Sequence, residues 1–443
     1  MANESSPRHR VVVIGGGFGG MHCTQALRRS PVEVTLIDRR NFHLFQPLLY
    51  QVATGGLSPA NIAAPLRSVF TGQRNATTLL AEVTGFDLGR KCVLLEDGDS
   101  VPFDTLVVAG GSTHHYFGHA EWEDHAPGLK TVEDATKIRR KVLTAFEKAE
   151  RTTDPAARQR LLTFVVVGGG PTGVEMAGSI SELARVTMRR DFRNIDPGVA
   201  KVILVEGQTR VLGGFHEKLS AYGLKALQDL GVEVQLDAHV VEIGPDRVVV
   251  KTDSGEGVRR IDTETIVWAA GVKASPLGKM LTDAVAAAGG APVPVGRAGH
   301  VAVSPDCSLP GRPDLFAIGD MASLAGAAGK PLPGVAQVAM QQGGYVGDVI
   351  HRRLKGDSVP GPFKYRDKGS MATIGRRRAV ADVGFMRFTG FIACLAWLAV
   401  HVLYIAHFSN RVLVLFQWLW NYVTRNRSAR LITGESAAKA VAS

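Results

Sequence analysis

Cysteine is scarce in this 443-residue sequence, which contains only Cys23, Cys92, Cys307 and Cys394. No two of them stand at a short spacing, which argues against a disulfide framework, a zinc site and a cysteine-bound iron–sulfur cluster. A redox-active pair of neighbouring thiols is missing for the same reason. The simplest interpretation is a reducing environment that faces the cytosol.

Several other signals are also missing. The 50 glycines follow no fixed period, so the chain is neither collagen-like nor of low complexity. We find no P-loop, no Ser-His-Asp arrangement and no recognisable nucleic-acid-binding motif. His114 and His115 are adjacent, but no further ligands follow at a suitable spacing. We therefore expect no metal site and place both histidines in a loop or at the surface.

The charge is concentrated at one end. Residues 351–443 carry 15 Lys and Arg against 4 Asp and Glu, while the whole chain has a formal charge of +10. Such a basic tail can face nucleic acid or anionic lipid. The length predicts two or three domains, and 45% apolar residues allow a large core.

The first motif is a glycine-rich turn between two short apolar runs. Val11–Ile14 precedes Gly15-x-Gly17-x-x-Gly20, a helical pattern follows, and Val32–Ile37 ends on Asp38. In a β-α-β unit of this kind, the glycines permit a tight turn and bring the backbone close to a pyrophosphate. The helix N-terminus favours the negative charge. Asp38 stands where it would accept hydrogen bonds from ribose hydroxyls.

The same arrangement recurs in the middle of the chain. Thr163–Val167 precedes Gly168-x-Gly170-x-x-Gly173, and Val202–Val205 ends on Glu206. A carboxylate there would repel a 2′-phosphate and so favours NADH over NADPH, although Arg210 nearby weakens this preference. Further buried strands are predicted at 105–109, 265–270 and 315–318, and a linker at 154–159.

Three further segments make the chain similar to the two-dinucleotide-binding flavoprotein reductases. They are Val107–Gly111, Trp268–Gly271 and Phe316–Asp320. The resemblance implies that non-covalent FAD occupies the N-terminal unit and NADH the internal one. It also implies that Gly319 and Asp320 contact FAD.

Other segments narrow the resemblance to type II NADH dehydrogenases. These segments are Asn41–Gln51, Pro171–Glu175 and Ala336–Gln341. The resemblance implies an enzyme that oxidises NADH by hydride transfer to FAD and reduces a membrane quinone without pumping protons. The expected fold is α/β, with two Rossmann-like domains, the second inserted in the first, and a C-terminal membrane-associating helical segment.

Three residues are implied to take part in catalysis. Gln337 and Gln341 are four residues apart and share a helix face, so their amides can donate hydrogen bonds to quinone carbonyls. The alternative is that these amides bond to local backbone. Glu175 is implied to supply protons, and its pKa would rise in a dry site. A carboxylate near a helix N-terminus is also favoured for purely structural reasons.

The resemblance supplies the remaining site residues and the domain bounds. Those expected to contact FAD are Gly15, Gly17, Phe18, Gly19, Gly20, Asp38, Arg39, Gln46, Ala109, Gly110, Gly319, Asp320, Ala336 and Gln337. Those expected to contact NADH are Gly168, Gly170, Pro171, Thr172, Gly173, Glu175, Glu206, Ala270 and Gly271. The expected domains are 1–125 with 300–358 for FAD, 126–299 for NADH and 359–443 for the membrane.

The C-terminal segment is apolar and aromatic. Residues 388–408 are long enough to span a bilayer, but aromatic and histidine residues are spread through them. Residues 412–423 are apolar too and precede Arg425, Arg427 and Arg430, which suits helices lying in one leaflet with arginines at anionic headgroups. We favour a peripheral, monotopic protein on the cytoplasmic side of the cell membrane; a spanning helix and a buried core or dimer helix are alternatives.

Two other enzymatic functions compete with quinone reduction by NADH. One is a sulfide:quinone oxidoreductase, which would need reactive cysteines near the flavin. The other is a soluble reductase that passes electrons to a protein partner. A non-catalytic flavoprotein whose tail binds nucleic acid is a third possibility, although we expect no nucleic-acid partner. The expected partners are a membrane quinone and an anionic lipid surface. A homodimer is also compatible with the sequence.

Overall fold

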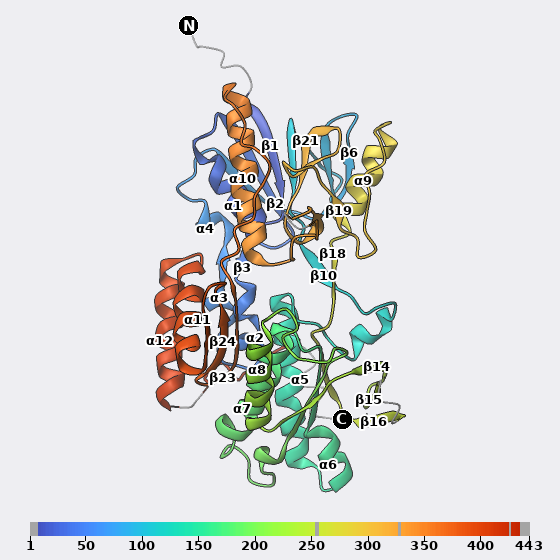
Figure 1. The fold of residues 1–443 in the computed structure, drawn as a ribbon, viewed down its shortest axis with the longest axis vertical. Coiled ribbons are helices and arrows are strands. Elements are labelled where there is room, and N and C mark those ends of the chain that lie inside the picture. The colour runs from blue at the N-terminus through green and yellow to red at the C-terminus, as the bar shows by residue number, and fades with distance from the viewer. Residues whose placement is uncertain (1–7, 253–256, 327–328, 425–426, 435–443) are drawn as a thin grey trace. The chain divides into compact units, whose positions relative to one another are not determined.

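The computed structural model describes residues 8–252, 257–326, 329–424 and 427–434. The chain forms two compact units and passes between them several times (Figure 1). Unit 1 comprises Met1–Leu44, Ala63–Thr113 and Val272–Asp367, and unit 2 comprises Phe45–Ile62, His114–Gly271 and Lys368–Ser443. Each unit contains its own parallel sheet, and each is described separately below.

Unit 1 is built on a sheet with the strand order β20-β21-β9-β1-β2-β5. All neighbours pair in parallel except β20, which is antiparallel to β21. Strands buried on both faces need continuous apolar runs, which explains the composition of β1 and β9. The strands are β1 (His9–Ile14), β2 (Val32–Asp38), β5 (Ala76–Leu80), β9 (Thr105–Val108), β20 (Ser308–Leu309) and β21 (Arg312–Ala317).

Different layers cover the two faces of this sheet. One face packs against α1 (Phe18–Ala26) and α10 (Ala336–Lys355), through buried side chains such as Met21 and Val346. The opposite face packs against a small antiparallel sheet and α9, through side chains such as Val93 and Leu281. These elements are β6 (Val83–Asp87), β7 (Cys92–Leu95), β8 (Ser100–Pro102) and α9 (Leu277–Ala287).

Unit 2 contains the second parallel sheet, in the order β13-β12-β11-β17. One face packs against the antiparallel sheet β14-β15-β16 through side chains such as Val165 and Val248. The sheet strands are β11 (Thr163–Val167), β12 (Lys201–Val205), β13 (Val232–Gln235), β14 (Ala238–Ile243), β15 (Arg247–Thr252), β16 (Val258–Asp262) and β17 (Thr265–Trp268). The accompanying helices are α5 (Val132–Arg151), α6 (Pro155–Leu161), α7 (Pro171–Glu182) and α8 (Glu217–Asp229). The expected α/β fold with two Rossmann-like units is confirmed.

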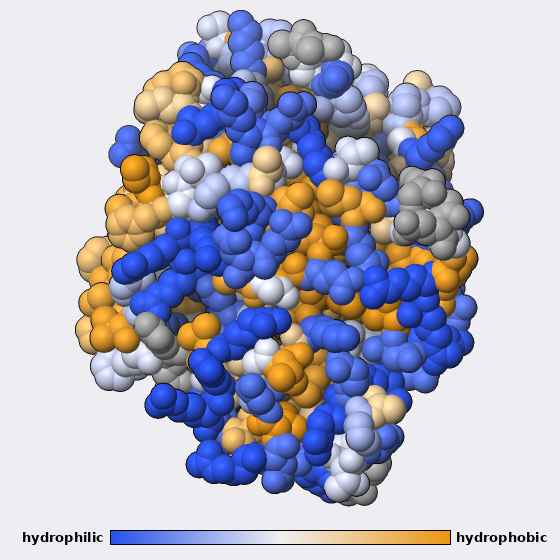
Figure 2. Space-filling model, turned by 60° about the horizontal axis from the view of Figure 1, so that its bottom comes forward, coloured by the Kyte–Doolittle hydropathy of each residue, from blue (hydrophilic) through white to orange (hydrophobic). Residues whose placement is uncertain are grey.

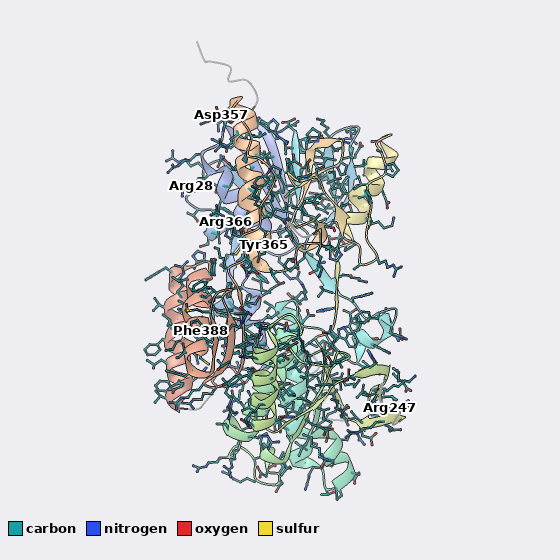
Figure 3. The ribbon with its side chains drawn as sticks, viewed as in Figure 1. Arg28, Arg247, Asp357, Tyr365, Arg366 and Phe388 are labelled. Atoms are coloured by element: carbon teal, nitrogen blue, oxygen red, sulfur yellow. The ribbon has the colours of Figure 1, made fainter. Side chains whose placement is uncertain are left out.

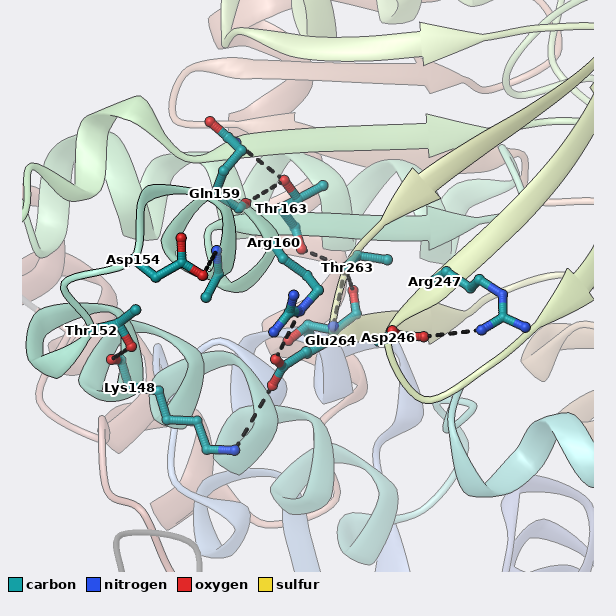
Figure 4. Close-up of polar contacts among 12 residues, drawn as sticks. Lys148, Thr152, Asp154, Gln159, Arg160, Thr163, Asp246, Arg247, Thr263 and Glu264 are labelled. Atoms are coloured by element: carbon teal, nitrogen blue, oxygen red, sulfur yellow. Dashed lines mark hydrogen bonds and ion pairs between the residues drawn. The ribbon is translucent and has the colours of Figure 1, made fainter. Parts of the chain in front are cut away.

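The linker predicted at 154–159 is wrong, because these residues begin α6 (Figure 4). The Asp154 carboxylate caps the helix by accepting from the backbone N–H groups of Ala156 and Ala157, at 3.0 and 3.3 Å. Pro155 occupies the first helical turn, where its missing N–H costs nothing. Arg160 then reaches Glu264 at 3.2 Å, so the segment is fixed to the end of the sheet. The Asp-Pro pair was a helix-start signal.

Residues 368–424 form a further layer of unit 2. The strands β23 (Ser370–Gly375), β24 (Arg378–Asp382) and β25 (Arg387–Thr389) form an antiparallel sheet, followed by α11 (Gly390–Tyr404) and α12 (Phe408–Thr424). The apolar run predicted at 388–408 is therefore divided, since Phe388 lies in β25 (Figure 3) and α11 ends at Tyr404. No helix in the described part of the chain combines the length and the apolar character that crossing a bilayer requires.

The arginines after α12 do not face outward as expected. The Arg427 guanidinium donates to the Glu182 carboxylate at 3.2 Å and to the carbonyl oxygen of Ser179 at 3.1 Å. Arg430 pairs with Asp191. Arg425 lies outside the described residues. Two of the three arginines therefore attach the returning chain to unit 2 through charge-assisted hydrogen bonds.

The expected domain bounds stay a prediction. The compact units place residues 272–299 with unit 1 and residues 368–434 with unit 2.

Candidate functional site

The first glycine-rich turn lies in unit 1, between β1 and α1. The Gly15 backbone N–H donates to the carbonyl oxygen of Ile37 at 2.8 Å, which ties the turn to the end of β2. The Asp38 carboxylate then accepts from the backbone N–H groups of Gly16 and Arg40, at 2.6 and 2.7 Å. Burial raises the pKa of Asp38, against the effect of these two hydrogen bonds. The carboxylate is thus held rigidly at the carboxyl end of the sheet.

The glycines of this turn have separate geometric roles. Gly15 has a φ of +100°, which favours glycine. A Cβ at Gly20 would lie 1.9 Å from the carbonyl oxygen of Gly15, so only glycine lets α1 pack this closely. A Cβ at Gly17 would meet no atom within 4 Å. The space beyond Gly17 is therefore open to a ligand, as a pyrophosphate cradle requires.

The second turn, in unit 2, repeats this geometry. Gly168 has a φ of +106°, and a Cβ at Gly173 would lie 1.7 Å from the carbonyl oxygen of Gly168. Nothing lies within 4 Å of the Cβ position of Gly170. The Glu206 carboxylate accepts from the backbone N–H of Gly169 and, at 2.8 Å, from that of Gln208. In both turns a carboxylate at the end of a strand accepts hydrogen bonds from two backbone N–H groups. We call this arrangement the carboxylate bracket.

A buried histidine contacts the first turn. His43 is 1% exposed, and its Nδ1 lies 2.9 Å from the carbonyl oxygen of Gly16, so Nδ1 carries the proton and donates. Nε2 is consequently an acceptor, and it has no hydrogen-bond partner. Burial lowers the pKa of His43 to about 4. The ring is therefore neutral, and its contact with Gly16 helps to fix the turn. No sequence signal distinguished His43, because only the fold brings it to Gly16.

Other residues predicted to contact FAD lie in the same unit. Asp320 accepts from the Ser112 hydroxyl at 2.6 Å. Gly319 has a φ of +72°, and its N–H donates to the side-chain oxygen of Gln342 at 2.7 Å. Gln342 is 1% exposed. Sequence reasoning missed Ser112 and Gln342, both of which fix the Gly-Asp segment in place.

The two glutamines predicted to line the quinone site are on α10, which begins at Ala336. The Gln341 amide donates to the carbonyl oxygen of Arg366 at 2.9 Å and accepts from its backbone N–H at 3.0 Å. Arg366 lies in the extended chain beside α10 (Figure 3). The local-backbone alternative therefore describes Gln341, which keeps one further N–H for a ligand. The quinone roles of Gln337 and Gln341 stay predictions.

For three residues that are predicted to contact FAD, the surrounding structure gives less support to that contact. Arg39 is exposed and lies 3.6 Å from Glu82. Gln46 belongs to unit 2, where its amide donates to the carbonyl oxygen of Lys130 at 3.2 Å. Gly110 is close-packed, since a Cβ there would lie 3.0 Å from the Ser275 hydroxyl oxygen. Their contacts with FAD stay predictions.

The remaining residues predicted to contact NADH lie in unit 2 near the second turn. Pro171 and Thr172 open α7. Ala270 and Gly271 follow β17, and Gly271 has a φ of +75°. These positions bring the ends of β11, β12 and β17 to one edge of the sheet, which is where open α/β sheets bind ligands.

Glu175 is a buried carboxyl on α7. It is 9% exposed and accepts from the backbone N–H of Thr373 on β23 at 3.3 Å. The close approach of the two elements depends on Gly178, whose Cβ would lie 1.8 Å from the carbonyl oxygen of Ile374. Burial raises the pKa of Glu175 to about 8. The group is therefore protonated near neutral pH and is able to deliver a proton.

The surroundings of the histidines and cysteines bear on the expectations for metal and thiol sites. His114 is not a surface residue, because its side chain is 11% exposed and bonds to Asp134 at 3.2 Å. Within the described ranges, no three His, Cys, Asp or Glu are grouped so that they could hold a metal. All four cysteines are free. Burial raises the pKa of Cys23 and Cys307 to about 12.

Comparison with known families covers most of the chain. Residues 9–343 match the family model described as pyridine nucleotide-disulphide oxidoreductase. Residues 368–426 match the NDH2 C-terminal domain. The class of protein is therefore that of nucleotide-dependent oxidoreductases with two dinucleotide-binding units.

Individual relatives define the family more narrowly. The type II NADH:quinone oxidoreductases Ndh and NdhA of Mycobacterium tuberculosis are 46% and 45% identical to this chain, over 97% of it and 91% and 90% of their own lengths. An external alternative NADH-ubiquinone oxidoreductase of Yarrowia lipolytica is 28% identical over 92% of this chain and 78% of its own. The chain belongs to the type II NADH:quinone oxidoreductases.

Solved structures share the fold. NDH2 of Plasmodium falciparum in complex with NADH has a TM-score of 0.86 at 19% identity, with 96% of this chain and all of that chain covered. The sulfide:quinone oxidoreductase of Aquifex aeolicus has a TM-score of 0.68 at 17% identity, with 98% and 94% covered.

Proposed function

We propose that this chain oxidises NADH by hydride transfer to non-covalent FAD and reduces a membrane quinone to the quinol without pumping protons. The observation that carries the proposal is the repeated turn. In each copy the carboxylate of Asp38 or Glu206 forms the carboxylate bracket, next to a glycine whose Cβ position is open to a ligand. We assign FAD to the first turn and NADH to the second, and membership of the type II NADH:quinone oxidoreductases supports this assignment.

The residues of each turn bind and orient one dinucleotide. Asp38 and Glu206 keep lone pairs that accept from ribose hydroxyls, and the open positions at Gly17 and Gly170 admit the pyrophosphates. When bound, FAD accepts the hydride and passes two electrons to the quinone. Asp320, held by Ser112, would provide a further polar contact for FAD.

Proton supply is assigned to Glu175. Reduction of a quinone to a quinol consumes two protons, and a carboxyl with a pKa of about 8 is protonated near neutral pH. The amides of Gln337 and Gln341 are proposed to donate hydrogen bonds to the quinone carbonyl oxygens.

Membrane attachment is assigned to α11 and α12. On α12, the exposed side chains of Leu413, Phe416, Leu419 and Val423 form one stripe, with Phe416 68% and Val423 71% exposed. Orange atoms gather at the left edge of Figure 2, on the side where α11 and α12 lie in Figure 1. Leucine and phenylalanine exposed in such numbers are typical of a surface that meets lipid.

A turn that contains two adjacent arginines contacts α12. Arg376 and Arg377 connect β23 to β24, and the Arg377 guanidinium donates to the Tyr422 hydroxyl at 2.6 Å. Arg377 has a φ of +63°, a conformation that favours glycine, so its side chain is retained at a backbone cost of about 1 kcal/mol. Among the ion pairs of the described residues, none involves Arg376 or Arg377. We assign the turn to anionic headgroups, on the cytoplasmic side of the cell membrane.

The alternatives receive less support. A sulfide:quinone oxidoreductase would need reactive thiolates, whereas burial raises the pKa of Cys23 and Cys307 far above neutrality. A soluble electron-accepting partner would leave the exposed apolar stripe on α12 in water. A homodimer is compatible with the proposal, and sedimentation of the detergent-solubilised chain tests it.

The central test is NADH oxidation by the FAD-loaded chain with a short-chain quinone. We expect steady turnover, and we expect Gln337→Ala to raise the quinone KM about tenfold through the loss of one hydrogen bond in a buried site. Reduction of FAD by NADH without quinone should be unchanged in this variant. Unaltered quinone kinetics would remove Gln337 from the site, and absence of any NADH oxidation by the wild type would overturn the function.

Membrane attachment is tested separately by co-sedimentation with vesicles. We expect binding to vesicles that contain phosphatidylglycerol, and weaker binding to neutral phosphatidylcholine vesicles. Arg377→Gly should narrow that difference, because it removes one of the charges of the turn, while the relief of backbone strain offsets part of the stability lost with the hydrogen bond to Tyr422. Equal binding of the wild type to both vesicles would contradict the headgroup role.

A further inference from the structure

A series of hydrogen bonds in unit 2 leads from α12 to Glu175. The Trp418 indole N–H donates to the side-chain oxygen of Gln51 at 2.7 Å, and the Gln51 amide donates to the Tyr50 hydroxyl oxygen at 3.0 Å. The Tyr50 and Thr373 hydroxyl oxygens are 2.8 Å apart. The backbone N–H of Thr373 donates to Glu175 at 3.3 Å. The series therefore connects a helix with an exposed apolar stripe to the buried carboxyl.

The polarity of the first two contacts follows from one residue. An indole N–H is only a donor, so Trp418 fixes the orientation of the Gln51 amide. That orientation makes the Gln51 nitrogen a donor and the Tyr50 oxygen an acceptor. The Tyr50 oxygen keeps a second lone pair, so either hydroxyl can donate in the contact between Tyr50 and Thr373. The contact with Tyr50 holds the Thr373 side chain, and the backbone N–H of the same residue donates to Glu175, a hydrogen bond that favours the ionised carboxylate.

Part of this series is buried inside unit 2. Tyr50 is 6% exposed and lies on α2 (Leu49–Ala53). The ionisable groups that share the region are Tyr50 itself, Glu182 on α7 and Arg427 after α12, and the last two form an ion pair at 3.2 Å. That pair is close to neutral as a whole, and the donor that the described residues place at the Glu175 carboxyl is the backbone N–H of Thr373.

We propose that Trp418, Gln51 and Tyr50 are positioning residues that act through Thr373 on the Glu175 carboxyl. The inference rests on the proposed role of Glu175 in proton supply. It adds that the apolar helix α12 takes part in setting the protonation of that carboxyl. The placement of α12 on a lipid surface would thereby influence the group that delivers protons to the quinone.

The experiment measures quinone reduction against pH for the full-length, FAD-loaded chain, with NADH and a short-chain quinone. Trp418→Phe keeps an aromatic ring against Trp397 but removes the indole N–H, and Tyr50→Phe removes the hydroxyl that faces Thr373. In both variants we expect the alkaline midpoint to move upward by about half a pH unit, because Thr373 is held less firmly and its N–H stabilises the carboxylate less well. The infrared band of the protonated Glu175 carboxyl, identified by its loss in Glu175→Gln, should report the same shift without turnover.

A matched control comes from the same helix. The Asn421 amide donates to the carbonyl oxygen of Gly56 at 3.0 Å and so also attaches α12 to unit 2, outside the series. Asn421→Ala should leave the midpoint unchanged. The proposal is overturned if Tyr50→Phe keeps the wild-type midpoint, or if Asn421→Ala moves it as far as Trp418→Phe does. A Glu175→Gln enzyme with the wild-type pH profile would instead refute the proton role of Glu175 itself.

Discussion

The two glycine-rich turns are nearly identical in backbone geometry but differ two residues further along their helices. Each turn closes on a carboxylate at the end of a strand. This carboxylate accepts from the backbone N–H of the residue after the first glycine of the motif, and from that of the residue two positions after the carboxylate itself. The helices then diverge. His22 on α1 is half-buried, with its Nδ1 2.9 Å from the carbonyl oxygen of Phe18, whereas Glu175 at the corresponding place on α7 is buried.

The difference comes from what packs on each helix. In unit 1, α1 packs against α10 and has no carboxyl at this position. In unit 2, α7 meets β23, and the missing side chain of Gly178 lets the strand come close enough for Thr373 to reach Glu175. We propose that the repeated motif binds a cofactor in both units, and that the C-terminal layer, by burying Glu175, adds proton supply in unit 2 only.

The largest difference between the two turns is expected when one methyl group is added at the closely packed glycine of each turn. In Gly20→Ala and Gly173→Ala the new Cβ would lie 1.9 and 1.7 Å from a carbonyl oxygen, so turn and helix must separate. We expect Gly20→Ala to purify with little FAD. Gly173→Ala should keep FAD but oxidise NADH about 100-fold more slowly, because the cofactor is misplaced. Flavin absorbance and NADH kinetics separate the two results, and loss of FAD in both variants would contradict the assignment of separate cofactors.

Removing the titrating group of α7 should have the next largest effect. Because burial raises the pKa of Glu175 to about 8, its proton-donating form is lost as the pH rises through that value. Quinone reduction by the wild type should therefore fall above about pH 8. Glu175→Gln should be about 100-fold slower and lack this fall. NADH-dependent flavin reduction is the control, and an unchanged profile would count against Glu175.

The same group makes stability depend on pH in a defined direction. A carboxyl whose pKa is raised from 4.5 to about 8 on folding binds a proton more tightly in the folded state. The unfolding free energy of the wild type relative to Glu175→Gln should therefore decrease between about pH 4.5 and 8, by roughly 1.4 kcal/mol per pH unit at most, and stay level above. Urea unfolding at several pH values measures it.

Neutralising the two bracket carboxylates should give a smaller and separable effect. Asp38→Asn should weaken FAD binding, and Glu206→Gln should raise the KM for NADH, each about tenfold, because a hydrogen bond to a charged group contributes about 1.5–3 kcal/mol. Glu206→Gln should also narrow the preference for NADH over NADPH. Flavin titration and kinetics with both nucleotides provide the measurement, and an unchanged KM for NADH would exclude Glu206 from the site.

The smallest effect is expected for the counterpart of Glu175 on α1. His22→Ala removes a side chain that bonds to its own helix, so FAD content and the pH profile should stay at wild-type values. The unfolding free energy should fall by about 1 kcal/mol or less. A shift of the pH profile in this variant would mean that the two helices are more alike in function than their packing indicates.

Much of the fold was accessible from local patterns. The strands predicted at 105–109 and 265–270 correspond to β9 and β17, and both glycine-rich turns were expected where they occur. These features depend on residues close together in the chain, such as a buried apolar run followed by a glycine with positive φ. The same local reasoning failed at 154–159, where the capping role of Asp154 was not recognised.

By itself, the sequence determined the two nucleotide-binding turns, the strand-end acids Asp38 and Glu206, and the apolar, basic character of the tail. Only the tertiary structure decided that Glu175 is buried beneath β23, that His43 points an unpartnered nitrogen near the first turn, and that Arg427 is used internally. Burial, and with it the pKa of a carboxyl, depends on which distant segments pack together. Patterns within a single segment carry no information about that packing.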